Sequence, residues 1–156
     1  MKVLRILVIA VGFGAALVSP QTPQTDVAIA QLQKSNPNAT WKSKSAVVAD
    51  VTCDGQLDTV VFGSEKSKVV VAVVPGGQPN KTQVFRFPIA RDKQDGFCAP
   101  PTRIRAAPLN CDTEGGPLEG CKPAKGCQEF TVDDDGCDPF NFYWDSPQRK
   151  IQWWRE

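Results

Sequence analysis

Histidine is absent from this 156-residue chain. Without an imidazole there can be no Ser-His or Cys-His nucleophile system. The sequence also lacks a glycine-rich phosphate loop and a dinucleotide-binding fingerprint. We therefore predict that the protein is not an enzyme. One alternative stays open, a carboxylate pair for glycoside hydrolysis formed by Glu129 with Asp133 or Asp145, although nothing in their spacing selects these residues.

A strong excess of charge of either sign is also missing. The chain has 18 Lys and Arg against 17 Asp and Glu, so its formal net charge is +1. A near-neutral chain gives no electrostatic reason to expect nucleic acid or an anionic membrane as a partner. Aspartates outnumber glutamates twelve to five, which favours turns and oxygen ligation over helices.

The apolar run near the N-terminus, residues 6–18, is too short to span a bilayer comfortably. It follows Lys2 and Arg5, and the small residues Gly14 and Ala16 have the spacing that signal peptidase favours. We predict that residues 1–16 are a signal peptide and that residues 17–25 are a flexible leader. The mature chain would then have no membrane span and would be periplasmic or secreted; a retained anchor is the alternative.

The cysteines all lie in the part predicted to be exported. An even number of cysteines behind a signal peptide predicts three disulfides, for which fifteen connectivities exist. Zinc is a poor alternative because the chain has neither a Cys-x-x-Cys pair nor histidine. We predict a bond between Cys53 and Cys98, with the other four cysteines paired among themselves. The predicted disulfide residues are Cys53, Cys98, Cys111, Cys121, Cys127 and Cys137.

The residue pattern predicts a mainly β fold with one short N-terminal helix. The helix would cover residues 26–35, with Asp26 as its N-cap and Pro37 ending the pattern. Strands rich in valine and aromatic residues would form an antiparallel meander or sandwich stapled by disulfides. We place them at residues 46–49, 57–62, 68–74, 82–89, 103–109, 128–132, 140–144 and 150–154. Residues 26–156 would form a single β-rich domain.

Aromatic residues mark the last two predicted strands. Phe140, Phe142 and Trp144 alternate along one strand and therefore share one face, which we interpret as core in preference to a binding surface. Trp153 and Trp154 are adjacent, so their indoles point to opposite faces. One of them would cover a second sheet or stand exposed as a ligand contact.

The most informative segment is an acidic loop at residues 50–58. Oxygen-bearing side chains at Asp50, Thr52, Asp54 and Asp58 occupy positions 1, 3, 5 and 9, and Gly55 occupies position 6. This offset pattern is typical of loops that wrap a hard cation, and glycine permits the sharp turn. The sequence therefore predicts a structural calcium site. An Asx-turn without metal is the alternative, whereas an EF-hand is disfavoured because position 12 is Val61 and the flanks favour strands.

Residues 46–74, with this loop and the two strands after it, resemble one unit of the FG-GAP or VCBS-type repeat. The resemblance implies calcium ligation by the side chains of Asp50, Thr52, Asp54 and Asp58 and by the backbone carbonyl of Gln56. It makes residues 26–98 a VCBS-like half and leaves residues 99–156 as a half rich in cysteine and aromatic residues. Only one clear unit is present, so a β-propeller is not predicted.

The chain as a whole resembles small cysteine-rich exported bacterial proteins that end in an aromatic strand and a Trp-Trp-Arg tail, a class without an assigned activity. A second acidic segment, residues 133–138, is similar to the first loop, but its spacing from Gly136 to Asp138 is one residue short. We interpret it as an acidic turn, with metal contact as the alternative.

Our leading functional hypothesis is a non-enzymatic secreted or periplasmic domain that binds a protein or cell-envelope ligand. A periplasmic inhibitor or immunity protein against a cell-wall hydrolase is one alternative, suited by a rigid loop such as residues 115–126. A carbohydrate-binding module is another, which would use Trp153, Trp154 or Trp41 as an exposed aromatic platform.

Overall fold

The computed structural model of the chain describes residues 23–156. Its α-helix, α1, spans Pro23–Ser35 and begins three residues earlier than predicted. Proline is favourable in the first helical turn because its fixed φ is already helical. Since the helix begins at Pro23, Asp26 lies in its first turn and is not the N-cap. Residues 23–25 of the predicted leader therefore belong to the helix, and Thr25 is buried.

The signal peptide, residues 1–16, and residues 17–22 of the leader lie outside the described residues. Within residues 23–156, none of the helical segments is both long and apolar enough to cross a membrane.

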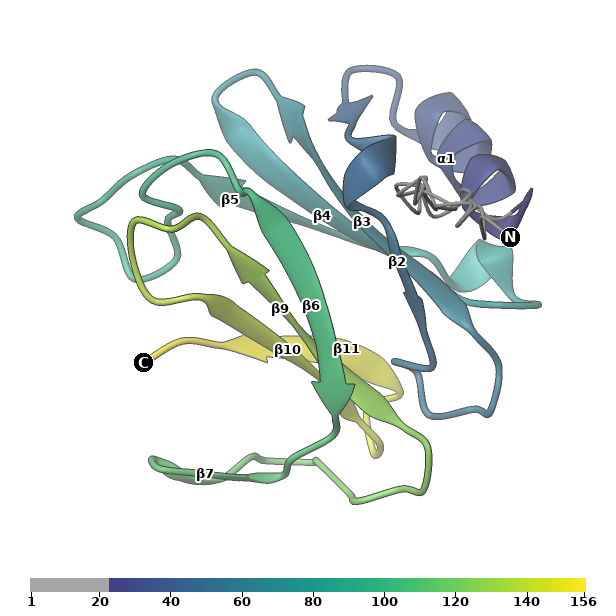
Figure 1. Cartoon of the computed structure of the whole chain (residues 1–156), viewed down its shortest axis with the longest axis vertical. Helices are drawn as coiled ribbons and strands as arrows, with labels where there is room; N and C mark the ends of the chain where they lie inside the picture. The colour runs from purple at the N-terminus through teal and green to yellow at the C-terminus, as the bar shows by residue number, and fades with distance from the viewer. Residues whose placement is uncertain (1–22) are drawn as a thin grey trace, which may run out of the picture.

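Two antiparallel sheets pack face to face and a short hairpin lies apart from them (Figure 1). The first sheet has the order β1-β3-β4-β5, and β2 also pairs with β3. Its strands are β1 Thr40–Trp41, β2 Val47–Ala49, β3 Asp58–Glu65, β4 Lys68–Val74 and β5 Gln83–Pro88, with the 3₁₀ turns η1 Ser43–Ser45 and η2 Pro79–Lys81 between them. The second sheet has the order β11-β10-β9-β6. Its strands are β6 Arg103–Pro108, β9 Gln128–Asp133, β10 Phe140–Asp145 and β11 Lys150–Trp154, and the hairpin is β7 Asp112–Thr113 with β8 Gly116–Pro117.

The valine-rich strand β4 is buried on both faces. Val69, Val71 and Val73 pack toward the second sheet, in one cluster with the phenylalanines. Their neighbours along the strand, such as Val70 and Ala72, pack with α1 in a second cluster. Alternating side chains point to opposite faces of a strand, so a strand covered on both sides reads as a continuous apolar run.

Phenylalanines fill the space between the two sheets. Phe130 and Phe142 stack with ring centroids 4.6 Å apart, and Phe140 lies 4.6 Å from Phe87 and 4.4 Å from Phe97. Phe140 and Phe142 are fully buried, as the alternating pattern predicted. The prediction of a mainly β, antiparallel, sandwich-like fold with one helix is confirmed, and the eight predicted strands correspond to β2–β6 and β9–β11. The short strands β1, β7 and β8 were not predicted.

The three disulfides are Cys53–Cys127, Cys98–Cys137 and Cys111–Cys121, so the predicted bond between Cys53 and Cys98 is wrong. The amide of Gln128 donates to the carbonyl of Asp50 at 2.8 Å, which places the start of β9 beside the 50–58 loop and brings Cys127 to Cys53. Cys98 lies instead beside the turn that follows β9. Three disulfides are typical of a protein that folds in an oxidising, extracellular-type environment.

We expect the Cys53–Cys127 bond to contribute more stability than Cys111–Cys121, because their cysteines are 74 and 10 residues apart in sequence. The chain-entropy model gives about 4.5 kcal/mol for the longer loop and about 2.7 kcal/mol for the shorter one. The free energies of urea unfolding of the Cys53→Ala/Cys127→Ala and Cys111→Ala/Cys121→Ala variants would measure the difference. Equal losses in the two variants would contradict the expectation.

Candidate functional site

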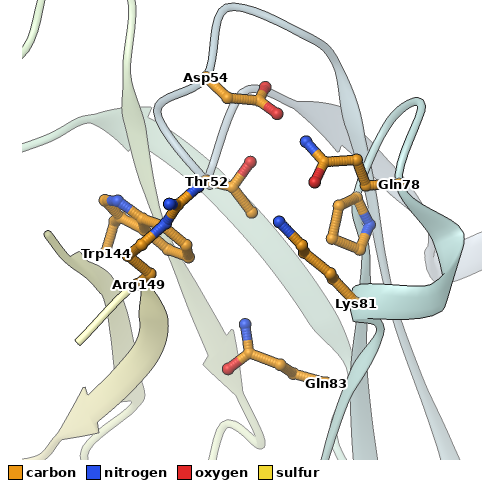
Figure 2. A pocket seen from close by; sticks show the side chains of 8 residues that line it. Thr52, Asp54, Gln78, Lys81, Gln83, Trp144 and Arg149 are labelled. Carbon is orange, nitrogen blue, oxygen red and sulfur yellow. The ribbon is translucent and has the colours of Figure 1, made fainter.

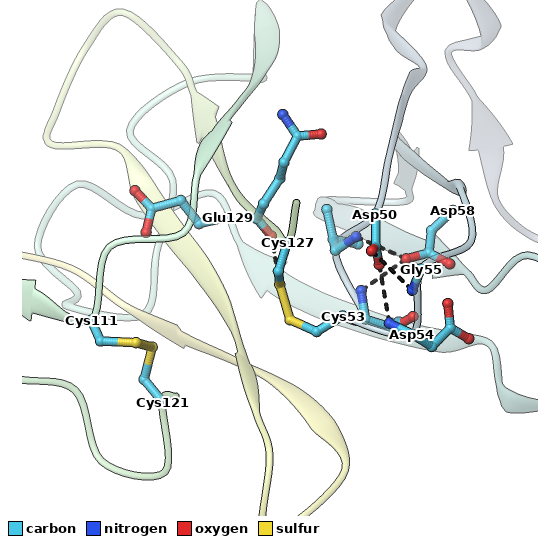
Figure 3. The surroundings of a disulfide bond; sticks show 12 residues. Asp50, Cys53, Asp54, Gly55, Asp58, Cys111, Cys121, Cys127 and Glu129 are labelled. Atoms are coloured by element: carbon cyan, nitrogen blue, oxygen red, sulfur yellow. Dashed lines mark hydrogen bonds between the residues drawn. A yellow bond between two sulfur atoms is a disulfide. The ribbon is translucent and has the colours of Figure 1, made fainter. Parts of the chain in front are cut away.

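The 50–58 loop folds around the carboxylate of Asp50. One of its oxygens accepts the amide of Asp54 at 3.2 Å and the other accepts the amide of Gly55 at 3.0 Å. Asp54 in turn accepts the amide of Gln56 at 2.9 Å. Gly55 has φ of 82°, which is the left-handed turn that the sequence pattern requires at this position. The loop thus satisfies its own amides with its own carboxylates (Figure 3).

Asp58, the last residue of the loop, connects its beginning to the chain that follows β4. It is fully buried, and one of its oxygens accepts the amides of Val51 and Thr52 at 2.9 and 2.8 Å. The other oxygen accepts the amide of Gly76, which follows β4, at 2.9 Å. Burial raises the pKa of Asp58 above its ordinary value, and the three amides offset part of that rise. Asp58 therefore fixes the backbone of two segments at the edge of the first sheet.

The five predicted calcium ligands lie in one loop, and two of its carboxylates are engaged with the backbone through both oxygens. Asp50 and Asp58 each accept backbone amides in this way, whereas the side chain of Asp54 is exposed. Across residues 23–156, no three or more His, Cys, Asp or Glu side chains form a group that could hold a metal. Asp54 has the most exposed carboxylate of the loop, and the calcium site remains a prediction.

The second acidic segment uses Asp134 in the same way as the loop uses Asp58. Its oxygens accept four backbone amides, at 2.6–3.1 Å, from Cys98, Ala99, Gly136 and Cys137. Burial alone would raise the pKa of Asp134, but the amide donors outweigh it, so the pKa lies below its ordinary value. The segment is a turn fastened to the chain around Cys98.

The carboxylates considered for glycoside hydrolysis are engaged elsewhere in the fold. Asp133 forms ion pairs with Arg103 and Arg105, at 2.7 and 3.1 Å. Asp145 is 1% exposed and accepts the backbone amide of Gln148 at 2.9 Å. Glu129 is half-buried, and desolvation raises its pKa above the ordinary value. These contacts give Asp133 and Asp145 structural roles.

The predicted aromatic contacts are mostly part of the interior. Trp41 is buried beneath α1, and Trp153 packs 5.5 Å from Phe87 and 5.3 Å from Phe140. Trp154 is half-buried. Trp144, which we interpreted as core, packs against the phenylalanine core and also lines a pocket.

That pocket lies between the two sheets and has a volume of about 370 Å³. We call it the intersheet pocket (Figure 2). It is lined by residues from the 50–58 loop, the connection after β4, the start of β5 and the β10–β11 hairpin: Thr52, Asp54, Pro75, Gln78, Lys81, Gln83, Trp144 and Arg149. The sequence analysis identified Thr52 and Asp54 but missed the basic and amide residues, which come from separate segments and share no motif.

A second depression lies on the other side of the 50–58 loop, between the loop and α1. This apolar groove has a volume of about 640 Å³, and its walls include Val27, Gln56, Leu57 and Pro79. Val27 is 68% exposed and Leu57 is 56% exposed, so this groove contains two large apolar side chains that are open to solvent. The side chain of Gln24 donates to the carbonyl of Leu57 and so links α1 to the loop.

Comparisons of the chain with protein-family models, with curated proteins and with solved structures found no match. The resemblance of residues 46–74 to an FG-GAP or VCBS unit therefore stays a prediction based on its residues.

The lowered pKa of Asp134 predicts acid sensitivity. A carboxylate whose pKa is lower in the folded state stabilises the fold above its unfolded pKa of about 3.9, and this contribution is lost as the pH falls. The raised pKa of Asp58 acts in the opposite direction, because its folded form takes up a proton first. The free energy of urea unfolding should therefore fall between about pH 5 and pH 3 less steeply in Asp134→Asn than in the wild type.

The matched control is Asp138→Asn, since Asp138 is exposed in the same turn. At neutral pH we also expect Asp134→Asn to be less stable than the wild type by roughly 1–3 kcal/mol, because amides lose their acceptor. Equal pH dependence in the wild type and both variants would contradict the role given to Asp134.

Proposed function

We propose that the protein is a non-enzymatic binding domain of the periplasm or the extracellular space, and that it recognises a protein partner through the apolar groove. The observation that carries the proposal is the exposure of Val27 and Leu57. Among the described residues only three large apolar side chains are exposed, and two of them line this one groove. Exposed apolar patches of this kind mark interaction surfaces in soluble proteins.

The groove has a rigid wall, which favours binding. Leu57 directly precedes Asp58, whose carboxylate is held by three amides, and the loop is tied to the second sheet by Cys53–Cys127. Gly76 lies so close to the carbonyl of Leu57 that a Cβ at this position would collide with it. A surface fixed in this way loses little conformational entropy when a partner binds.

The test is the substitution of each groove residue by aspartate. Val27→Asp and Leu57→Asp should each weaken capture of the partner from envelope or secreted extract by about tenfold or more, because a charge would be buried at the contact. Affinity for the captured partner would be measured by biolayer interferometry, with thermal unfolding to verify the fold.

Ile89→Asp is the matched control, since Ile89 is the third exposed large apolar residue, at 41%, and does not line the groove. Equal weakening by Ile89→Asp, or full binding by Leu57→Asp, would remove the groove from the proposal.

Calcium belongs to the proposal as a ligand of the 50–58 loop. The carboxylates of Asp50 and Asp54 support it, and so does the left-handed turn at Gly55. With Asp50 and Asp58 both accepting amides, water would have to supply several of the six to eight oxygens that calcium takes. This ligand set favours a site that stabilises the loop and performs no chemistry.

Millimolar calcium should therefore raise the melting temperature of the wild-type protein, because it would bind only the folded loop. Asp54→Asn should abolish the rise, whereas Asp138→Asn, which removes an exposed carboxylate far along the chain, should keep it. The measurement is thermal unfolding with calcium and with EDTA, together with calorimetric titration of the protein with calcium. A melting temperature that calcium does not change would refute the site.

One observation supports the inhibitor alternative. The β7–β8 hairpin lies outside both sheets (Figure 1) and is closed by Cys111–Cys121. Cys121 at its base forms a β-bridge with Asp145 of β10, so the hairpin is a projecting loop fixed at its base. Recovery of a cell-wall hydrolase by the wild type, with loss of its activity, would favour this alternative over a non-inhibitory partner.

A further inference from the structure

We propose that the intersheet pocket binds a sugar acid, with Lys81 and Arg149 holding its carboxylate and Trp144 covering one face of its ring. The residues come from both sheets and from the 50–58 loop, and the labelled side chains extend into the same space (Figure 2). A volume of about 370 Å³ is at the small end of the range for ligand pockets, which suits one or two sugar rings.

The two cations in the pocket have no partner within the described chain. Neither Lys81 nor Arg149 has a side-chain hydrogen bond or ion pair among residues 23–156. Arg103 and Arg86, by contrast, pair with Asp133 at 2.7 Å and with Glu65 at 2.9 Å. Two unpaired cations that line one concave surface favour an anionic ligand, since a guanidinium can donate two parallel hydrogen bonds to a carboxylate.

The charge of the pocket favours a single carboxylate over a phosphate. Its ionisable lining residues are Lys81, Arg149 and Asp54, which leave one net positive charge. A monoanion neutralises that charge. A phosphate monoester, with a charge near −2, would exceed it and would also be repelled by Asp54.

The neutral residues in the pocket favour a hydroxylated ring. Trp144 is half-buried against the core and lines the pocket, and its indole is an amphipathic ring. The Oε1 atom of Gln83 accepts the amide of Ile151 at 3.0 Å, which fixes this side chain and leaves its NH₂ group as a donor. Gln78 and Asp54 add further polar groups for sugar hydroxyls. A few fixed polar groups around an aromatic surface are typical of small-molecule sites.

This site is separate from the apolar groove. The 50–58 loop forms a wall of each, with Thr52 and Asp54 on the pocket side and Gln56 and Leu57 on the groove side. The inference therefore goes beyond the proposed protein partner, and either can fail without the other.

Calorimetric titration of the mature protein tests it with four defined probes: D-glucuronate, D-glucose, D-glucose 6-phosphate and acetate. We expect glucuronate to bind, and glucose and acetate to bind at least about tenfold more weakly. Glucose lacks the carboxylate for Lys81 and Arg149, and acetate lacks the sugar ring for Trp144. Tighter binding of glucose 6-phosphate than of glucuronate would overturn the carboxylate assignment. Equal binding of acetate and glucuronate would overturn the role of the ring, and no binding of glucuronate would overturn the inference.

Substitutions locate the site. Lys81→Gln and Arg149→Gln should each weaken glucuronate binding by about tenfold, through the loss of a charge-assisted hydrogen bond. Lys122→Gln and Arg91→Gln, at exposed positions outside the pocket, are the matched controls and should bind as the wild type does. All four are surface changes that should leave thermal unfolding unchanged. Equal weakening in the controls, or full binding by both pocket variants, would overturn the assignment of these residues.

Discussion

The carboxylate of Asp58 is the contact on which the arrangement of the molecule depends. It accepts two amides from the start of the 50–58 loop and one from Gly76, and so holds together the end of β2, the start of β3 and the exit of β4. Backbone amides that are buried without an acceptor cost free energy, and a short loop cannot satisfy them through a sheet ladder. The buried carboxylate satisfies three of them at once. The loop it fixes is then joined to the second sheet by Cys53–Cys127 and by the hydrogen bond from Gln128 to Asp50.

Asp58 and the Cys53–Cys127 bond form one corner of the molecule, in which a buried carboxylate and a disulfide hold the same loop. The same combination recurs at a second corner, formed by Asp134 and the Cys98–Cys137 bond. Asp134 accepts four amides from two segments, and the Cys98–Cys137 bond joins those same segments. In each corner a disulfide limits the unfolded chain, while a carboxylate organises the irregular backbone of the folded one. The two carboxylates differ in pKa because desolvation outweighs the donors at Asp58, whereas the donors outweigh desolvation at Asp134. The sheets supply the core, and these corners determine how the loops at its edges are held.

The sequence was sufficient to predict the sheets but not the corners. Valine runs and the alternation of Phe140, Phe142 and Trp144 carry local information, because strand periodicity and burial depend on neighbours along the chain. The cysteine pairing depends on which loop ends meet after the sheets have stacked, so spacing could not identify Cys127 as the partner of Cys53. The oxygens at positions 1, 3, 5 and 9 predict a cation loop, but the sequence does not determine whether an aspartate faces a cation or accepts amides, and Asp58 accepts amides. The pocket residues Lys81, Gln83 and Arg149 come together only through tertiary structure.

Asp54 connects the two ligand proposals. It lines the intersheet pocket and belongs to the loop proposed for calcium. A cation at Asp50 and Asp54 would offset the carboxylate charge at the edge of the pocket and so strengthen the attraction of Lys81 and Arg149 for an anion. Two ligands that share a residue in this way are coupled, and each would raise the affinity of the protein for the other by the same factor. The chain has almost no net charge to steer a ligand over long range. Recognition of a charged ligand would then depend on local charge at a site formed before binding, and the fixed 50–58 loop, which lines both the intersheet pocket and the apolar groove, supports such a site.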